Sequence, residues 1–117
     1  MAIDTESPDF KWYLRHVQFF KDKDVDGLLA SDYTDDARLM SYDFDLQGKD
    51  QLKFAFTQYL DTIGDFTLDS TEQFHMTPTA VILEATLTTE KAGIRRVWDV
   101  FLLRDGKISH HFTGLRG

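Results

Sequence analysis

The sequence predicts an α+β domain in which helices pack on one face of a curved antiparallel sheet. Two observations support this fold class. Apolar residues recur at helical spacing as far as Gly64, and they alternate with polar residues after it. A chain of 117 residues also matches the usual size of one domain, so we expect a single unit over residues 1–117. Helices followed by a meander of strands form two layers around one core.

Three helices are expected in the first half of the chain. The first begins at Ser7-Pro8, because serine caps helices and proline suits the first turn, and it continues to Lys21. A short second helix is expected from Val25 to about Ser31, and a third from Gly48 to Gly64. The first helix has an apolar arc broad enough for burial on more than one side, made of Phe10, Trp12, Tyr13, Leu14, His16, Val17, Phe19 and Phe20.

The other segments predict a loop, a short strand and a four-stranded meander. Residues 32–36 are rich in aspartate, which is typical of a turn-rich loop, and residues 38–42 predict a short strand. Alternation of apolar and polar residues predicts strands over 66–74, 79–89, 94–104 and 107–113. The pair Asp105-Gly106 is a strong hairpin signal between the last two strands.

Asp99 is the single ionisable residue in the apolar run from Val97 to Leu103. A buried charge there costs several kcal/mol unless it is paired, protonated or held by donors. By strand alternation, Asp99 shares a face with Val97, Phe101 and Leu103, and the opposite face carries Trp98, Val100 and Leu102. One interpretation is a structural acid satisfied by Arg95, Arg96, a tyrosine or a histidine. The other, which we favour, is the polar end of a small-molecule pocket.

Composition and charge exclude several classes of function. The net charge of −7 and the pI of about 4.9 argue against a nucleic-acid groove or an anionic membrane surface as partner. No segment approaches the run of about 20 apolar residues that crosses a membrane. The first residues lack the pattern of a signal peptide, and there is no cysteine, so we expect a cytoplasmic protein without disulfides.

We expect no metal and no cofactor. The acidic cluster lacks the spacing of a calcium loop and indicates a solvated surface; its members are Asp32, Asp35, Asp36, Asp43 and Asp45. No pair of histidines and carboxylates has spacing that compels a metal site. The chain also has no phosphate loop, dinucleotide fingerprint or nucleophile elbow.

Several segments together resemble a known superfamily. They are the run 24–27 (Asp-Val-Asp-Gly), the loop 34–37, Gly48 before the third helix and, above all, the run from Trp98 to Ile108. In this order they look like the nuclear-transport-factor-2-like superfamily, with the SnoaL-like and ketosteroid-isomerase-like branch nearest. The resemblance covers about residues 8–116. It implies a cone in which three N-terminal helices pack on a curved antiparallel sheet with a mixed edge.

The resemblance also implies catalytic positions. Ketosteroid isomerase has an oxyanion-hole tyrosine where this chain has His16, and Asp99 matches its second oxyanion donor, a carboxylic acid kept protonated by apolar surroundings. Its catalytic base falls near Ser41, Tyr42 or Asp43, which stay open as alternatives. His16 is either a buried neutral histidine or, across the cone, the acid/base partner of Asp99.

The predicted site therefore has Asp99 and His16 as catalytic residues. The pocket lining is expected from Tyr13, Val17, Tyr42, Phe56, Tyr59, Val97, Phe101 and His110. His110 and His111 occupy opposite faces of the last strand, with His110 on the face of Ile108, and the sequence leaves open which of them faces the pocket. His75, near Pro78, is expected to be exposed.

Three classes of function remain. The first is a cofactor-free isomerase, cyclase or dehydratase acting on a small apolar cyclic or polyketide-like molecule. The second, an epoxide hydrolase of the same superfamily, is disfavoured because Val97 stands where that pattern has arginine. The third is a non-catalytic ligand-binding or dimerisation module. The apolar face of Trp98, Val100 and Leu102 separately predicts a homodimer packed sheet against sheet.

Overall fold

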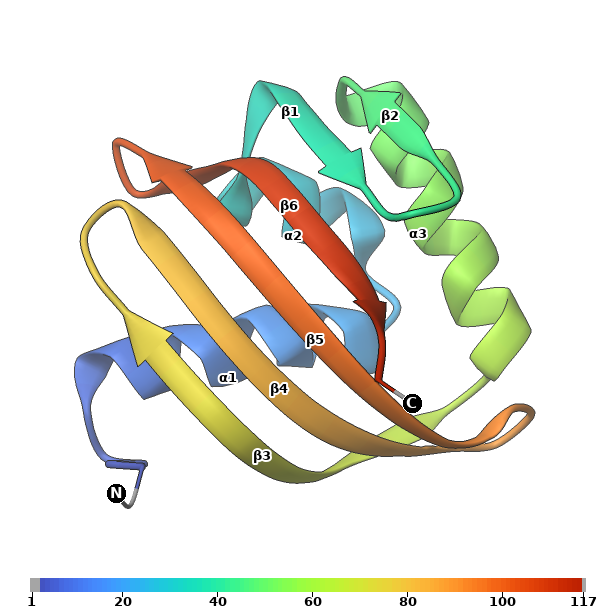
Figure 1. The fold of residues 1–117 in the computed structure, drawn as a ribbon. Helices are drawn as coiled ribbons and strands as arrows, with labels where there is room; N and C mark the ends of the chain where they lie inside the picture. Colours follow the sequence, from blue (N-terminus) through green and yellow to red (C-terminus); the bar gives the residue numbers. More distant parts are fainter. Residues whose placement is uncertain (1–2, 117) are drawn as a thin grey trace.

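The computed structural model describes residues 3–116, which form a six-stranded mixed sheet with three helices on one of its faces (Figure 1). The strand order is β2-β1-β6-β5-β4-β3, and every neighbouring pair is antiparallel except β1 and β6. The helices are α1 (Pro8–Lys21), α2 (Val25–Asp32) and α3 (Lys49–Ile63). The strands are β1 (Tyr33–Met40), β2 (Asp45–Gln47), β3 (Phe66–Met76), β4 (Ala80–Thr89), β5 (Gly93–Arg104) and β6 (Lys107–Leu115). The predicted α+β class is confirmed.

The helix ends lie where the sequence predicts them. Ser7 Oγ accepts a hydrogen bond from the backbone N–H of Phe10 at 3.1 Å, and Pro8 occupies the first turn of α1. Helix α3 ends at Gly64, whose φ of 70° is unfavourable for other residues. In the hairpin between β5 and β6, Asp105 and Gly106 both have positive φ, as the predicted two-residue turn requires.

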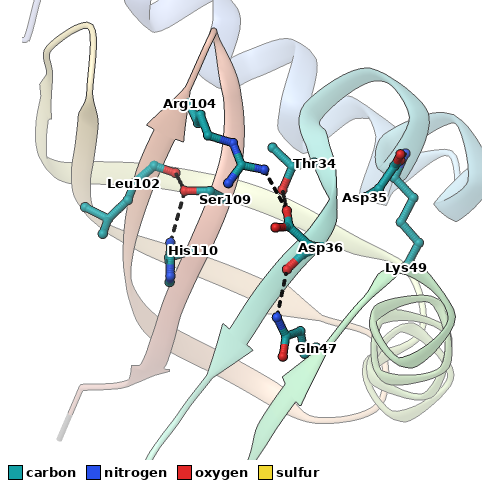
Figure 2. Close-up of polar contacts among 9 residues, drawn as sticks. All are labelled: Thr34, Asp35, Asp36, Gln47, Lys49, Leu102, Arg104, Ser109 and His110. Atoms are coloured by element: carbon teal, nitrogen blue, oxygen red, sulfur yellow. Dashed lines mark hydrogen bonds and ion pairs between the residues drawn. The ribbon is translucent and has the colours of Figure 1, made fainter.

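The acidic segment 32–36 is not a loop, which corrects the prediction for this part of the chain. Residue 32 ends α2, and β1 begins at Tyr33 and runs parallel to β6. The strand forms because the inward side chains of Tyr33 and Ala37 are fully buried, while the intervening carboxylates reach solvent. In Figure 2, Arg104 donates to the Asp36 carboxylate at 2.7 Å and the side chain of Gln47 lies against the Asp36 carbonyl.

A β-bulge in β6 changes which side chains face inward. Leu102 pairs with His110 but Leu103 pairs with Ile108, so Ser109 is an extra residue on β6. The Ser109 hydroxyl donates to the Leu102 carbonyl at 3.2 Å and lies 3.0 Å from His110 Nδ1 (Figure 2). Both Ile108 and His111 are buried as a result. The expectation that His110 shares the face of Ile108 is therefore wrong, because it assumed unbroken alternation.

The core lies between the sheet and the helices. Its most completely buried side chains come from all layers of the fold and are Leu28, Tyr33, Leu52, Ile63, Val81, Leu83, Phe101 and Ile108. Their removal from water is the main favourable term in folding. No helix within residues 3–116 is long and apolar enough to cross a membrane, and the cytoplasmic location stays a prediction.

The other face of the sheet carries Trp98, Val100 and Leu102 with no helix over it (Figure 1). Leu102 is exposed, and Trp98 and Val100 are half-buried. The Trp98 indole lies directly over Gly114 of β6, where a Cβ atom would come within 2.6 Å of the indole nitrogen. Glycine is therefore the residue that allows this contact.

We expect Gly114→Ala to lower the free energy of unfolding by about 1–3 kcal/mol, because the added methyl group displaces the Trp98 ring. Urea denaturation of both proteins measures the difference. The matched control is the same change in a Trp98→Leu background, where the loss should be much smaller. An equal loss in both backgrounds would contradict the proposed clash.

Candidate functional site

Asp99 lies on the inward face of β5, opposite Leu83 of β4 and Thr113 of β6. Its Oδ1 atom is 2.7 Å from His111 Nε2 on the neighbouring strand. The side chain of Asp99 is 18% exposed, whereas that of His111 is only 6% exposed. Solvent therefore reaches the carboxylate but scarcely reaches its histidine partner.

His111 joins Asp99 to a third group. The hydroxyl of Tyr33 lies 2.9 Å from His111 Nδ1. Burial is the largest influence on His111 and lowers its pKa below the ordinary value of 6.5, so the ring is neutral at pH 7. A neutral ring that donates from Nε2 to the carboxylate accepts at Nδ1, and the Tyr33 hydroxyl donates to it. Tyr33 keeps its proton, because burial and then the charge of Asp99 raise its pKa well above 10.0.

His16 does not pair with Asp99, as the sequence had suggested for the catalytic site. Its Nδ1 atom is 2.8 Å from Asp32 Oδ2, and both residues are buried. Ser31 donates to the other oxygen of Asp32 at 2.9 Å. The expectation that Asp32 is a solvated surface residue is wrong. A signal was present, because Val25, Leu28, Leu29 and Asp32 share one helical face and the first three are apolar.

Aromatic rings fill the interior between the two histidines, where the sequence predicted an open apolar chamber. Phe101 lies between the two histidines, 5.2 Å from the His16 ring and 4.5 Å from the His111 ring. Phe56 closes the other side, with its ring 5.3 Å from Phe20 and 6.1 Å from His111. Two surface hollows of about 220 and 410 Å³ occur elsewhere over residues 3–116, and none of these rings lines them.

The remaining predicted lining residues divide into two groups. Tyr13, Phe56 and Phe101 are buried in the core, and Val17, Tyr59 and Val97 are partly buried against it. Tyr42 and His110 lie away from this interior, which corrects their assignment. Tyr42 is 90% exposed in the β1–β2 turn, with its ring 6.1 Å from Trp98 on the outer sheet face. His110 is half-buried beside Phe112 because the bulge at Ser109 turns it outward.

Two tyrosines of the interior are protonated donors at neutral pH. Burial raises the pKa of Tyr13 to about 12, against the lowering effect of its hydrogen bond to Thr71. The two hydroxyl oxygens are 3.1 Å apart. Burial also raises the pKa of Tyr59, the charge of Asp99 raises it further, and the charge of Arg95 lowers it. The charges of Asp99 and Arg95 on β5 thus act on Tyr59 of α3 in opposite directions.

The candidate bases predicted near Ser41, Tyr42 and Asp43 lie at the β1–β2 turn and not in this interior. Asp43 is exposed like Tyr42, and Ser41 forms a backbone hydrogen bond across the turn to Phe44 at 2.9 Å. Among residues 3–116, no three His, Cys, Asp or Glu side chains are grouped to hold a metal ion. The polar chemistry of the inner face thus centres on Asp99, His111 and the tyrosines.

Comparison with known proteins identifies a matching family and similar folds. The family model described as a SnoaL-like domain matches residues 13–111. No curated protein matches the chain. Solved structures match over most of the chain at low identity, which establishes likeness of fold.

Three such structures illustrate the likeness. A nuclear-transport-factor-2-like protein from Anabaena variabilis has a TM-score of 0.74 and 19% identity, covering 100% of this chain and 96% of its own. A candidate SnoaL-like polyketide cyclase from Shewanella putrefaciens has a TM-score of 0.75 and 9% identity, covering 94% and 81%. TerC co-crystallised with polyporic acid has a TM-score of 0.74 and 17% identity, covering 94% and 92%.

The lowered pKa of His111 predicts that stability falls in mild acid. Below pH 6.5 an unfolded chain binds a proton at this histidine that the folded protein does not bind, so the free energy of unfolding decreases as the pH falls from that value. The contribution is fully present above pH 6.5. Urea denaturation between pH 7.5 and 5 measures the slope.

His111→Gln should reduce this slope, and the exposed His75→Gln should leave it unchanged. The same slope in His111→Gln and in the unaltered protein would assign the pH dependence to other groups.

Proposed function

Because this chain belongs to the SnoaL-like domain family and has the nuclear-transport-factor-2-like fold, we propose that it binds a small, mostly apolar molecule beside Asp99. Asp99 then moves a proton on that molecule without a cofactor, as an isomerase, cyclase or dehydratase does. The names of the neighbours agree with this class, since one is a candidate polyketide cyclase and another was crystallised with polyporic acid.

The observation that supports this function most is the unequal exposure of the Asp99–His111 pair. His111 Nε2 holds one carboxylate oxygen at 2.7 Å, and the other oxygen has no hydrogen bond within residues 3–116. Since 18% of the side chain remains exposed, that second oxygen is the atom available to a ligand. A carboxylate beside apolar groups such as Val97 is a competent base for a proton next to a carbonyl.

The other groups have supporting roles in this scheme. His111 is a positioning residue, because it orients the carboxylate and is itself sealed from solvent. Tyr59 is a candidate donor to a developing enolate oxygen, since it stays protonated at neutral pH. His16 is occupied by Asp32 and has no direct role. In this scheme Asp99 acts as a base, whereas the resemblance to ketosteroid isomerase implied a protonated donor at this position.

A second candidate function is a non-catalytic binding or dimerisation module. It is favoured by the rings of Phe20, Phe56 and Phe101, which occupy the space between the two histidines. In that case the polar chain from Tyr33 to Asp99 serves only to satisfy buried groups. The experiment on Asp99 below separates the two functions.

We also propose that the chain forms a homodimer through the outer face of its sheet. Trp98, Val100 and Leu102 lie on this face together with Ile82, which is 55% exposed. Apolar side chains gathered on an uncovered sheet face favour burial against a second apolar surface. A second copy of the same face offers such a surface around a two-fold axis.

We expect Asp99→Asn to abolish proton transfer while leaving the fold intact, since asparagine keeps the shape and accepts the His111 hydrogen bond. A panel of cyclic 1,3-diketones and aromatic polyketide mimics in D₂O reports proton abstraction as deuterium incorporation, followed by NMR. The rate should fall by about 10²–10⁴-fold. Asp105→Asn is the matched control, because Asp105 is exposed in the hairpin and asparagine tolerates its positive φ.

An unchanged rate in Asp99→Asn would remove Asp99 from the reaction. No exchange with any compound, together with no ligand that raises the melting temperature, would favour the non-catalytic module.

Sedimentation at micromolar concentration should give twice the chain mass of 13.6 kDa. Leu102→Asp should convert the protein to a monomer, because it buries an unpaired charge at the centre of the proposed interface. Phe54→Asp is the control, since Phe54 is exposed on α3 and away from the outer sheet face. A monomer before any substitution would contradict the dimer.

A further inference from the structure

Arg95 lies on the same inward face of β5 as Asp99. Arg95 pairs with Leu87 of β4, which is buried on the inner face. Val97, which lies between Arg95 and Asp99 on β5, pairs with buried Ala85. Side chains four residues apart on a strand share a face and are separated by about 13 Å along it. Phe101 on this face is 2% exposed, whereas Asp99, Val97 and Arg95 are all half-buried. The inner face is therefore less completely covered from Asp99 to Arg95 than at Phe101.

The guanidinium of Arg95 makes no ion pair or hydrogen bond with any of residues 3–116. Arg96, the next residue on β5, also lacks such a partner among these residues, but it is exposed on the outer side of the strand, whereas Arg95 is half-buried on the inner side. Arg38, Arg104 and Arg116 each have a carboxylate within 3.3 Å. A half-buried cation that lacks a partner is costly, and its planar fork suits a bidentate contact with an anion.

Tyr59 links Arg95 to the site around Asp99. Its hydroxyl senses both charges, since Asp99 raises its pKa and Arg95 lowers it. Tyr59 is partly buried against the core on α3, as Val97 is on β5 between Arg95 and Asp99. Partly buried apolar groups such as Val97 and Leu68 lie on the same side of the sheet, so the half-buried acid and the half-buried cation have apolar neighbours.

We propose that Arg95 binds an anionic group of the ligand, a carboxylate or sulfonate, while the apolar body of that ligand extends toward Asp99. This rests on the proposed function and narrows its substrate class to amphipathic organic anions. The net charge of −7 repels anions in general, so a preference for them has to come from a local cation. Arg95 is that cation, and it acts on binding and orientation rather than on the proton transfer.

Two fluorescent probes of nearly the same apolar shape test the proposal. 8-Anilinonaphthalene-1-sulfonate carries a sulfonate, and N-phenyl-1-naphthylamine lacks it. Dissociation constants for both are measured with the unaltered protein, Arg95→Gln, Arg95→Lys and Arg96→Gln. Arg96→Gln is the matched control, since it removes the same charge from the exposed, outer side of the same strand. Circular dichroism confirms that each variant is folded.

We expect Arg95→Gln to weaken the sulfonate probe by about tenfold or more and to leave the neutral probe within twofold, since a charged hydrogen bond is lost only for the anion. Arg95→Lys should restore part of the affinity, and Arg96→Gln should change neither probe. Equal loss of the sulfonate probe in Arg95→Gln and Arg96→Gln would overturn the role of Arg95. So would an unaltered protein that binds the two probes equally well.

These outcomes separate the two proposals. Binding of the neutral probe with no contribution from Arg95 would overturn the anion site and leave the apolar site beside Asp99 intact. Failure of both probes to bind the unaltered protein would overturn both.

Discussion

The partly buried carboxylate of Asp99, on the inner face of β5, is stabilised by a hydrogen bond from His111 Nε2 at 2.7 Å. This contact determines the state of each neighbouring group. It fixes the proton of His111 on Nε2, which leaves Nδ1 to accept from Tyr33, and the second oxygen of Asp99 has no hydrogen bond within residues 3–116. Three strands, β1, β5 and β6, are thereby tied together by side chains inside the core as well as by their backbones. The proposed chemistry therefore depends on a hydrogen bond that also links β5 to β6.

The same interior contains a second buried histidine–carboxylate pair, His16 with Asp32, on the helical side. Phe101 lies between the two histidine rings and separates the pairs, so each histidine packs against aromatic rings and bonds to its own carboxylate. Buried polar pairs of this kind add little net stability, but they penalise any packing that leaves them unsatisfied. The pair on α1 and α2 fixes the helices to each other, and the pair on the sheet fixes the strands. We interpret the first as structural and the second as the one that reaches solvent.

Periodicity and turn chemistry were sufficient to predict the helices and the meander. The cap at Ser7, the stop at Gly64 and the turn at Asp105-Gly106 each depend on a local rule that tertiary packing did not override. The inward direction of Asp99 also followed from simple alternation. The site was predicted less well, because its partners depend on long-range geometry. One extra residue, Ser109, turns His111 rather than His110 toward the interior. The aspartates of residues 32–36 are typical of a loop, so the sequence predicted neither the strand that begins at Tyr33 nor the burial of Asp32.

The parallel pairing of β1 with β6 has a consequence for how the chain is made. Tyr33 and its hydrogen-bond partner His111 are 78 positions apart. His111 is on β6, the last strand along the chain, which lies between β1 and β5 and completes the sheet. A ribosome adds about 5–20 residues per second, so the N-terminal half waits for several seconds before its tyrosine can find that partner. During this time the edge of β1 is open to association with other nascent chains. With this topology, the sheet is completed only after β6 has left the ribosome, and until then a chaperone that binds the nascent chain would protect the open edge of β1.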